Sequence, residues 1–240
     1  MCILLDVRSV VVGPGPIQAE SDPRARRRAA RRAENQTEIL DAAERVFGEH
    51  GIRDGSVRQI AELSGFSTGA IYLFFDNKQH LVAETMVRRG DELINALHAG
   101  AEGDSSALVK LHHIVDVTVA FFEERSDFRR MLRHITDGTS VVGPTLAAYG
   151  GDGNGSFMAA MTLIAGIVGA GQSAGEIRDG DTYAIAHLYS VLINEHVLLA
   201  AENASGTGML TPEQFHGLVD GMLRNPVRAE HQPRKRRRLT

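Results

Sequence analysis

Apolar residues recur every three or four positions along most of this chain, which is the spacing of a helix that buries one face. The first stripe begins after Asn35 and consists of Ile39, Ala43, Val46, Phe47 and His50. Further stripes cover residues 105–124, 126–136, 157–170 and 179–203, and the last begins at Thr211. No segment shows the strict alternation of apolar and polar residues that is typical of a half-buried strand. The pattern predicts an all-α fold.

Residues 51–78, which follow the first stripe, carry signals for helix ends and tight turns. Gly51 predicts the end of the first helix. Ser56 precedes Gln59 by three residues, which is the spacing of a capping box and predicts the start of a second, short helix. Gly65 predicts a tight turn after that helix, because glycine adopts positive φ values at little cost.

A third short helix is predicted from Thr68 to about Phe74, with Ser67 as its cap, and residues 76–79 begin a fourth that runs towards Leu97. Two short helices joined by a glycine turn are the pattern of a helix-turn-helix motif. In that motif the second helix lies in the major groove of DNA, and its first residues contact base edges. The same pattern also occurs as plain packing in helical proteins, so both interpretations stay open at this point.

The order and spacing of residues across this region are distinctive. They comprise ILDAAERVF at 39–47, Gly51, SVRQIA at 56–61, SGFSTGAIY at 64–72 and FFDNK at 74–78, followed by Leu81. This series resembles the DNA-binding domain of the TetR family of bacterial one-component transcriptional regulators. The resemblance implies an N-terminal three-helix helix-turn-helix domain and a C-terminal helical domain that binds a ligand and forms a homodimer.

The resemblance also implies which side chains contact DNA. Base edges would be contacted by Arg58, Thr68, Gly69 and Ala70, and the phosphate backbone by Tyr72, Phe74 and Lys78. Ser67, at the start of the same helix, belongs to the predicted DNA-binding set. Phe74 has no hydrogen-bond donor, whereas the family often has a polar or aromatic hydrogen-bonding side chain at this position.

Charge is distributed unevenly, although 26 basic and 30 acidic residues give a net charge of only −4. Six arginines lie within residues 24–32, and a second basic run ends the chain. Such runs are typical of segments that bind polyanions, and equally of solvated tails. We expect residues 1–32 to be a disordered basic arm in which Arg27, Arg28 and Arg31 contact DNA, and residues 227–240 to be a disordered basic tail.

Residues 33–79 are then the predicted DNA-binding domain, and residues 80–226 the predicted effector-binding and dimerisation domain. Ligand pockets in proteins are mostly apolar with a few polar groups. On that basis the candidate pocket residues are Phe121, Phe128, Met131, His134, Phe157, Met161, Gln172, Asn194 and His196. The candidate dimer helices are 179–203 and 211–224, which could form a four-helix bundle across a two-fold axis.

We therefore expect a ligand-responsive transcriptional regulator, above all a repressor that binds a palindromic operator and is released by a small, mostly apolar effector. An activator, or a regulator that needs its ligand as corepressor, is the alternative, because the sequence does not set the sign of the response. A remote alternative is a serine esterase, since residues 171–175 read GQSAG and fit the G-x-S-x-G pattern around Ser173.

Other classes are disfavoured by composition. Cys2 is the single cysteine, so neither an intrachain disulfide nor a cysteine-based zinc cluster is expected. The histidines show no H-x-x-x-H spacing, and no metal or cofactor is expected. No continuous apolar run reaches the length of a membrane span, so no membrane-spanning helix is expected. The cysteine usage favours a reducing cytoplasm, and the TetR resemblance implies a regulator that is not an enzyme.

Overall fold

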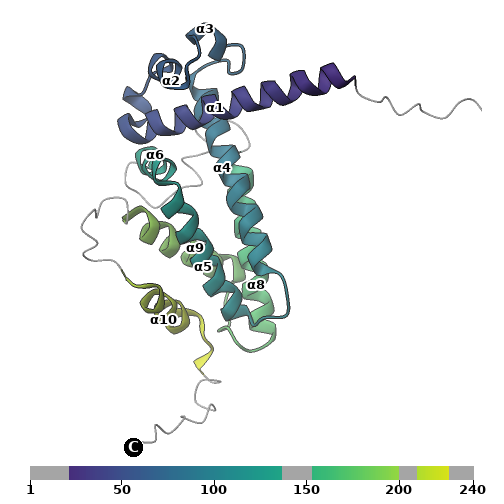
Figure 1. Ribbon diagram of the computed structural model, residues 1–240. Coiled ribbons are helices and arrows are strands. Elements are labelled where there is room, and N and C mark those ends of the chain that lie inside the picture. The colour runs from purple at the N-terminus through teal and green to yellow at the C-terminus, as the bar shows by residue number, and fades with distance from the viewer. Residues whose placement is uncertain (1–21, 137–152, 200–209, 227–240) are drawn as a thin grey trace, which may run out of the picture. The chain divides into compact units, whose positions relative to one another are not determined.

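The computed structural model describes residues 22–136, 153–199 and 210–226 (Figure 1). Within these ranges the chain forms helices and turns, with one isolated bridge between Ile177 and Arg224. The helices are α1 (Pro23–Asp54), α2 (Val57–Ser64), α3 (Thr68–Ile71), α4 (Lys78–Ala101), α5 (Ala107–Glu124), α6 (Ser126–Thr136), α8 (Gly153–Ser173), α9 (Thr182–Leu199) and α10 (Pro212–Leu223). The prediction of an all-α fold is confirmed.

The chain divides into two units, residues 1–36 and residues 37–240. In the first unit, helix α1 begins at Pro23, so the expectation that residues 1–32 are a disordered arm is wrong for residues 23–32. Alanine and arginine favour helices, and the side chain of Asp22 accepts a hydrogen bond from the backbone N–H of Arg24 at 3.0 Å. The remaining arm residues, 1–21, and the tail from 227 onward lie outside the described residues.

In the second unit, the rest of α1 buries the predicted stripe of Ile39, Ala43, Val46 and Phe47. His50 is exposed instead, so its place on this stripe was wrong. Gly51 has a φ of 77°, which interrupts the helix where the sequence predicted its end. Helix α3 stops at Ile71, three residues earlier than expected, and the chain continues to Phe74 in turns.

Helix α5 is at the centre of the helical body, because α4, α6, α8, α9 and α10 all pack against it. Helix α4 leads from the short helices α2 and α3 into this body and packs along α5 and α8 (Figure 1). The body's core is apolar and includes Leu111, Ile114, Met131, Met161 and Tyr189. A single long helix therefore joins the motif of short helices to the body.

Helix α8 begins at Gly153, four residues before the predicted start, and α9 begins at Thr182 rather than Asp179. The segment Gly155–Ser173 of α8 is long and apolar enough to cross a membrane by length and composition, although no uninterrupted apolar run of that length occurs in the sequence. In the structure α8 packs against α4, α5 and α9, and 28% of this segment is buried within the described part of the chain. Packing within this body therefore accounts for part of its apolar composition.

Close approach between α1 and α6 depends on Gly48. A Cβ atom at this position would lie 2.4 Å from the backbone oxygen of Asp127. We expect Gly48→Ala to lower the free energy of unfolding by about 1–3 kcal/mol, the usual cost of overpacking against a backbone that cannot yield. Urea denaturation followed by circular dichroism measures this change.

Gly166→Ala is the matched control, because Gly166 lies in helix α8 and a Cβ there would meet nothing within 4 Å. Alanine is the better helix former, so the control should gain about 0.5–1 kcal/mol. Equal effects of the two substitutions would contradict the proposed contact between α1 and Asp127.

Candidate functional site

Helices α2 and α3 are defined by the local signals that the sequence displays. Ser56 and Gln59 form the predicted capping box of α2, and Gly65 ends that helix with a φ of 74°. Ser67 caps α3, since its hydroxyl accepts a hydrogen bond from the backbone N–H of Ala70 at 3.1 Å. Ile60 and Ile71 are fully buried, so the two helices share a core and their outer faces are set by it.

The outer face of α3 is open. Thr68 and Gly69 are exposed, and a Cβ atom at Gly69 would meet only the Ser67 hydroxyl, at 3.9 Å. Tyr72 and Leu73 follow with 52% and 75% of their surface exposed. Small side chains at the start of a helix, next to an exposed tyrosine, leave room for another macromolecule to approach its backbone closely.

Arg58 and Lys78, both predicted to contact DNA, have different surroundings. Arg58 is exposed on α2 and forms an ion pair with Glu62 one turn later, at 2.9 Å. The ammonium group of Lys78 donates to the backbone oxygens of Arg53 and Gly55, at 3.0 and 2.8 Å. Lys78 therefore fastens the start of α4 to the end of α1, a structural role that sequence reasoning missed.

Phe74, also predicted to contact the phosphate backbone, is half-buried beside Phe75 and packs on the core.

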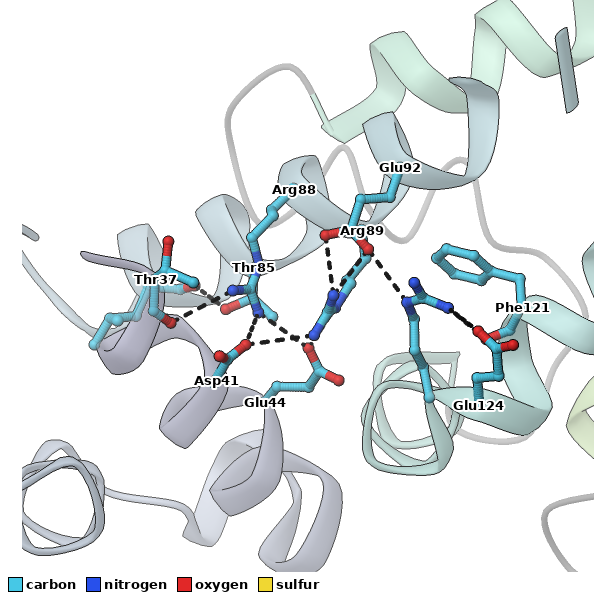
Figure 2. Close-up of polar contacts among 11 residues, drawn as sticks. Thr37, Asp41, Glu44, Thr85, Arg88, Arg89, Glu92, Phe121 and Glu124 are labelled. Carbon is cyan, nitrogen blue, oxygen red and sulfur yellow. Dashed lines mark hydrogen bonds and ion pairs between the residues drawn. The ribbon is translucent and has the colours of Figure 1, made fainter. Parts of the chain in front are cut away.

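A network of charged side chains joins α1 to α4 (Figure 2). Glu44 of α1 is buried, and one of its oxygens accepts from Arg88 at 3.2 Å and from Arg89 at 2.7 Å. Arg88 also pairs with Asp41 at 2.8 Å. Removing one partner of a buried ion pair costs several kcal/mol, typically about 3–5. The network therefore constrains how α1, and the short helices that follow it, sit on α4.

The same network continues to α5. Arg89 donates to both oxygens of Glu92, at 3.0 and 2.8 Å, and Arg125 donates to Glu92 at 3.2 Å. Partial burial by itself would raise the pKa of Glu92, but the hydrogen bonds and charges of Arg89 and Arg125 hold it below its ordinary value. The guanidinium of Arg125 also lies 4.1 Å above the centre of the Phe121 ring.

A cavity of about 110 Å³ lies between α4, α5, α6, α8 and α9. Its wall is mostly apolar, with Leu93, Ile114, Phe122 and Ile164 among the lining residues. Five lining residues have polar side chains, namely Arg89, Thr118, Ser156, Ser190 and Asn194. Gly90 brings α4 close to α8 at this wall, since a Cβ there would lie 2.9 Å from the Cβ of Ser156.

The cavity brings together Phe128, Phe157 and Asn194 of the nine predicted pocket residues. Phe121, Met131 and Met161 are core residues that do not line it. The remaining three predicted residues have other surroundings. His134 lies against Gly51, and the side-chain amide of Gln172 donates to the backbone oxygens of Arg178 and Gly180. The ring of His196 packs on the ring of Phe215, with 4.6 Å between their centroids. Burial lowers the pKa of His196. The α4 residues of the wall were missed, although Met86, Gly90, Leu93 and Leu97 recur at helical spacing.

Ser173 ends helix α8, and its hydroxyl donates to the backbone oxygen of Gly169 at 3.0 Å. A nucleophile elbow instead requires a strand before the serine and a helix after it. Gly175 follows with a φ of 68°, and the backbone N–H of Glu176 donates to Gly171. Gly171, Gln172 and Ser173 are thus part of helix α8, the turn begins at Ala174, and this geometry does not support the esterase interpretation.

The predicted dimer helices, α9 and α10, each present exposed apolar side chains. Leu188 and Leu199 of α9 and Leu218 of α10 are between 41% and 59% exposed. Leu198, Phe215 and Val219 of the same two helices are buried within the body. Part of the apolar surface of α9 and α10 is thus used inside the chain, and part remains outside.

Comparison with known proteins supports a helix-turn-helix class. Residues 39–85 match the family model described as bacterial regulatory proteins, tetR family. A stretch of 50 residues is 42% identical to the HTH-type transcriptional repressor KstR2 of Rhodococcus jostii (strain RHA1), covering 21% of this chain and 24% of that protein. The chain therefore matches about a quarter of this relative's length.

Solved structures extend the likeness to the whole fold. The transcriptional regulator FadR from Bacillus subtilis, in complex with stearoyl-CoA, has a TM-score of 0.63 and 20% identity, over 77% of this chain and 95% of that one. AibR in complex with isovaleryl coenzyme A and operator DNA has a TM-score of 0.60 and 18% identity, over 80% and 99%. These comparisons show that residues 39–85 resemble bacterial regulatory proteins of the tetR family and that the fold resembles that of solved bacterial transcriptional regulators.

The contrast between Lys78 and Arg58 can be tested. Lys78→Met removes two hydrogen bonds from a charged donor, and we expect it to lower the free energy of unfolding by about 1–3 kcal/mol. Arg58→Met breaks only an exposed pair within one helix, which is worth about 0.3–0.5 kcal/mol. Thermal and urea denaturation of both variants measure the difference, and a larger loss in Arg58→Met would contradict the assignment.

Proposed function

We propose that this chain is a ligand-responsive transcriptional regulator that binds operator DNA through α2 and α3. The observation that carries the proposal is the open N-terminal face of α3 within a TetR-family DNA-binding domain. Thr68, Gly69 and Ala70 are small enough for the helix to enter a major groove, with Thr68 as a hydrogen-bonding group. Tyr72 and Arg58, both exposed, suit phosphates and base edges respectively.

The helical start of α1 supports a second contact with DNA. In an α-helix Arg24, Arg27, Arg28 and Arg31 share one face, because residues three and four apart are neighbours. Four cationic side chains on one face form a stripe that attracts a phosphate backbone. We therefore keep Arg27, Arg28 and Arg31 as DNA contacts, with a helix in place of the flexible arm that the sequence suggested.

A homodimer is the assembly that the proposal requires. Exposed Leu188, Leu199 and Leu218 supply an apolar face on α9 and α10, and a two-fold axis would pair that face with itself. A symmetric pair of recognition helices matches a palindromic operator, whose half-sites lie about one helical turn of DNA apart.

The cavity is the proposed effector site. Pockets for drug-sized ligands measure about 300–1,000 Å³, whereas this cavity measures about 110 Å³. A larger effector must therefore displace a wall, and α4 is both a wall and the direct continuation of the DNA-binding domain. The structures of relatives solved with stearoyl-CoA and isovaleryl coenzyme A indicate that this fold accommodates ligands with an apolar acyl part.

We propose repression relieved by the effector as the response, because expansion of the cavity would disturb the contacts between α1 and α4. A ligand shifts an equilibrium only by its differential affinity for the two states. In the opposite response, the effector promotes DNA binding, either as a corepressor or by enabling the protein to act as an activator. That response requires the ligand-bound arrangement to be the one that fits DNA.

Thr68→Ala and Tyr72→Ala test the proposed recognition helix. A duplex selected from a random library by the full-length protein serves as the probe at near-physiological salt. We expect each variant to bind this duplex at least about fivefold more weakly, because each loses a hydrogen-bonding contact worth about 1–3 kcal/mol. Sedimentation should show an unchanged oligomeric state. If both variants bind like the wild type, α3 is not the recognition helix.

The arginine face of α1 is tested separately by salt dependence. Each phosphate contact contributes about 0.9 to the slope of log K against log salt. Replacing Arg27, Arg28 and Arg31 by Gln should therefore reduce that slope by about two to three. Lys110→Gln, on α5 of the body, is the control and should leave it unchanged. An unaltered slope in the triple variant would remove the arginines from the interface.

A further inference from the structure

Arg89 takes part in two sites at once. It is the only charged residue that lines the cavity within the described part of the chain. Its Nε donates to Glu44 of α1 at 2.7 Å, and its other nitrogens donate to Glu92 and, at 3.4 Å, to Asp41 (Figure 2). A ligand that contacts Arg89 from the cavity therefore competes for the same side chain that holds α1.

The buried part of this network has fewer acceptors than donors. Glu44 is 6% exposed, and a single oxygen of its carboxylate serves both Arg88 and Arg89, which are 18% and 16% exposed. The Nε of Arg88 is buried with no hydrogen-bond partner among the described residues. Asp41 is 56% exposed, so water screens much of its charge. A further anion would be stabilised on the buried side.

The rest of the cavity wall determines the chemical character of the part of the ligand that lies away from Arg89. Leu93, Leu97, Ile114 and Ile164 provide an apolar surface, and the hydroxyls of Thr118 and Ser156 are engaged with Ile114 and Asp91. An engineered apolar cavity of about 150 Å³ holds benzene, so the present cavity suits a short chain of carbon atoms. A carboxylate matches the planar fork of a guanidinium.

We propose that the cavity takes an amphipathic monocarboxylate whose anionic group binds Arg89 in exchange for Glu44. This inference deepens the proposed function and rests on the cavity being its effector site. The apolar chain lies among the leucines and isoleucines of the wall, and the carboxylate accepts hydrogen bonds from the guanidinium. Glu44 then retains only Arg88, at the longer distance of 3.2 Å.

This exchange makes ligand binding and the position of α1 mutually dependent. A buried carboxylate that loses a partner becomes costly to keep buried. Movement of α1 residues 37–54 away from α4 exposes Glu44 to water and lowers that cost. By linkage, a partner such as DNA that holds α1 in place weakens binding of the carboxylate, and the carboxylate weakens binding of that partner by the same factor.

Hexanoate, hexan-1-ol and hexylamine are the probes, because they share one chain and differ in the charge of its end. Calorimetric titration of the full-length protein should show hexanoate binding at least about tenfold more tightly than either of the others. Arg89→Met should abolish that preference. Glu44→Gln should raise the affinity for hexanoate several-fold, because it removes the competitor for Arg89, and a merely structural role of Arg89 would not produce this gain.

Two further measurements make the result unambiguous. Ala160→Phe fills the cavity from α8, and hexanoate binding that persists in this variant would place the probe elsewhere and overturn the inference. Hydrogen exchange of residues 37–54 should be faster with saturating hexanoate in the wild type and unchanged by it in Arg89→Met. Should Arg89→Met fail to fold, the Arg89→Met/Glu44→Gln double variant, which leaves no unpaired Glu44, replaces it.

The outcomes separate this inference from the proposed function. Equal binding of hexanoate and hexan-1-ol overturns the anionic class and leaves an apolar effector site in place. Tightest binding of hexylamine also overturns it. Absence of hexanoate binding to the wild type overturns the inference as well. The proposed regulator function is tested independently, by whether the protein selects a specific duplex and whether binding of that duplex depends on Thr68 and Tyr72.

Discussion

The buried carboxylate of Glu44 is the constraint on which the arrangement of this molecule depends. A charge removed from water must be compensated nearby, and the partners here are two consecutive arginines on another helix. Because both converge on one oxygen, α1 is held at a defined height and rotation on α4. Apolar packing alone tolerates small slides between helices, whereas a shared ion pair of this kind does not.

Tight glycine contacts and an unfilled cavity lie near this ion pair, and they differ in how much helix movement they allow. Gly48 and Gly90 let α1 approach α6 and α4 approach α8 so closely that an added methyl group would collide with a neighbour. These glycine contacts leave no slack, while the apolar cavity beside them leaves unfilled space. Helix α4 is therefore held against α8 at Gly90 and against α1 by its ion pairs with Glu44, while the cavity beside it leaves it room to move, which a conformational relay requires.

The elements that sequence reasoning predicted best are those governed by residues within four positions of one another. The capping box of Ser56 and Gln59 and the turn at Gly65 each define a helix end locally, and both are found in the structure. The last helix likewise begins after Thr211, as predicted, with a capping box to Gln214. The start of α1 was predicted too late because its arginines and alanines lack an apolar stripe. That segment is helical because of backbone preference and the cap at Asp22, with no need of a buried face of its own.

The candidate site was less accessible to prediction, for a physical reason. Whether an apolar residue lines a cavity or fills the core depends on helices far away in sequence, so Phe128 and Phe121 look alike until the fold is known. Charged residues with such roles are also difficult to identify from sequence, because charge normally indicates an exposed position. Arg89 and Lys78 read as surface residues, yet one lines the cavity and the other binds two backbone oxygens.

The turn that follows α8 has a mechanical consequence for the far end of the chain. Its Glu176 accepts a hydrogen bond from the first residue of α5, Ala107, through its side chain, while its backbone oxygen accepts one from Asn225. Arg178 donates to Leu223 in the same short pairing. The last helix is thus tied to the end of a cavity wall, so a ligand that pushes α8 outward also pulls on α10. If α10 forms the proposed dimer interface, this hydrogen-bonded turn connects the cavity wall of each subunit to that interface.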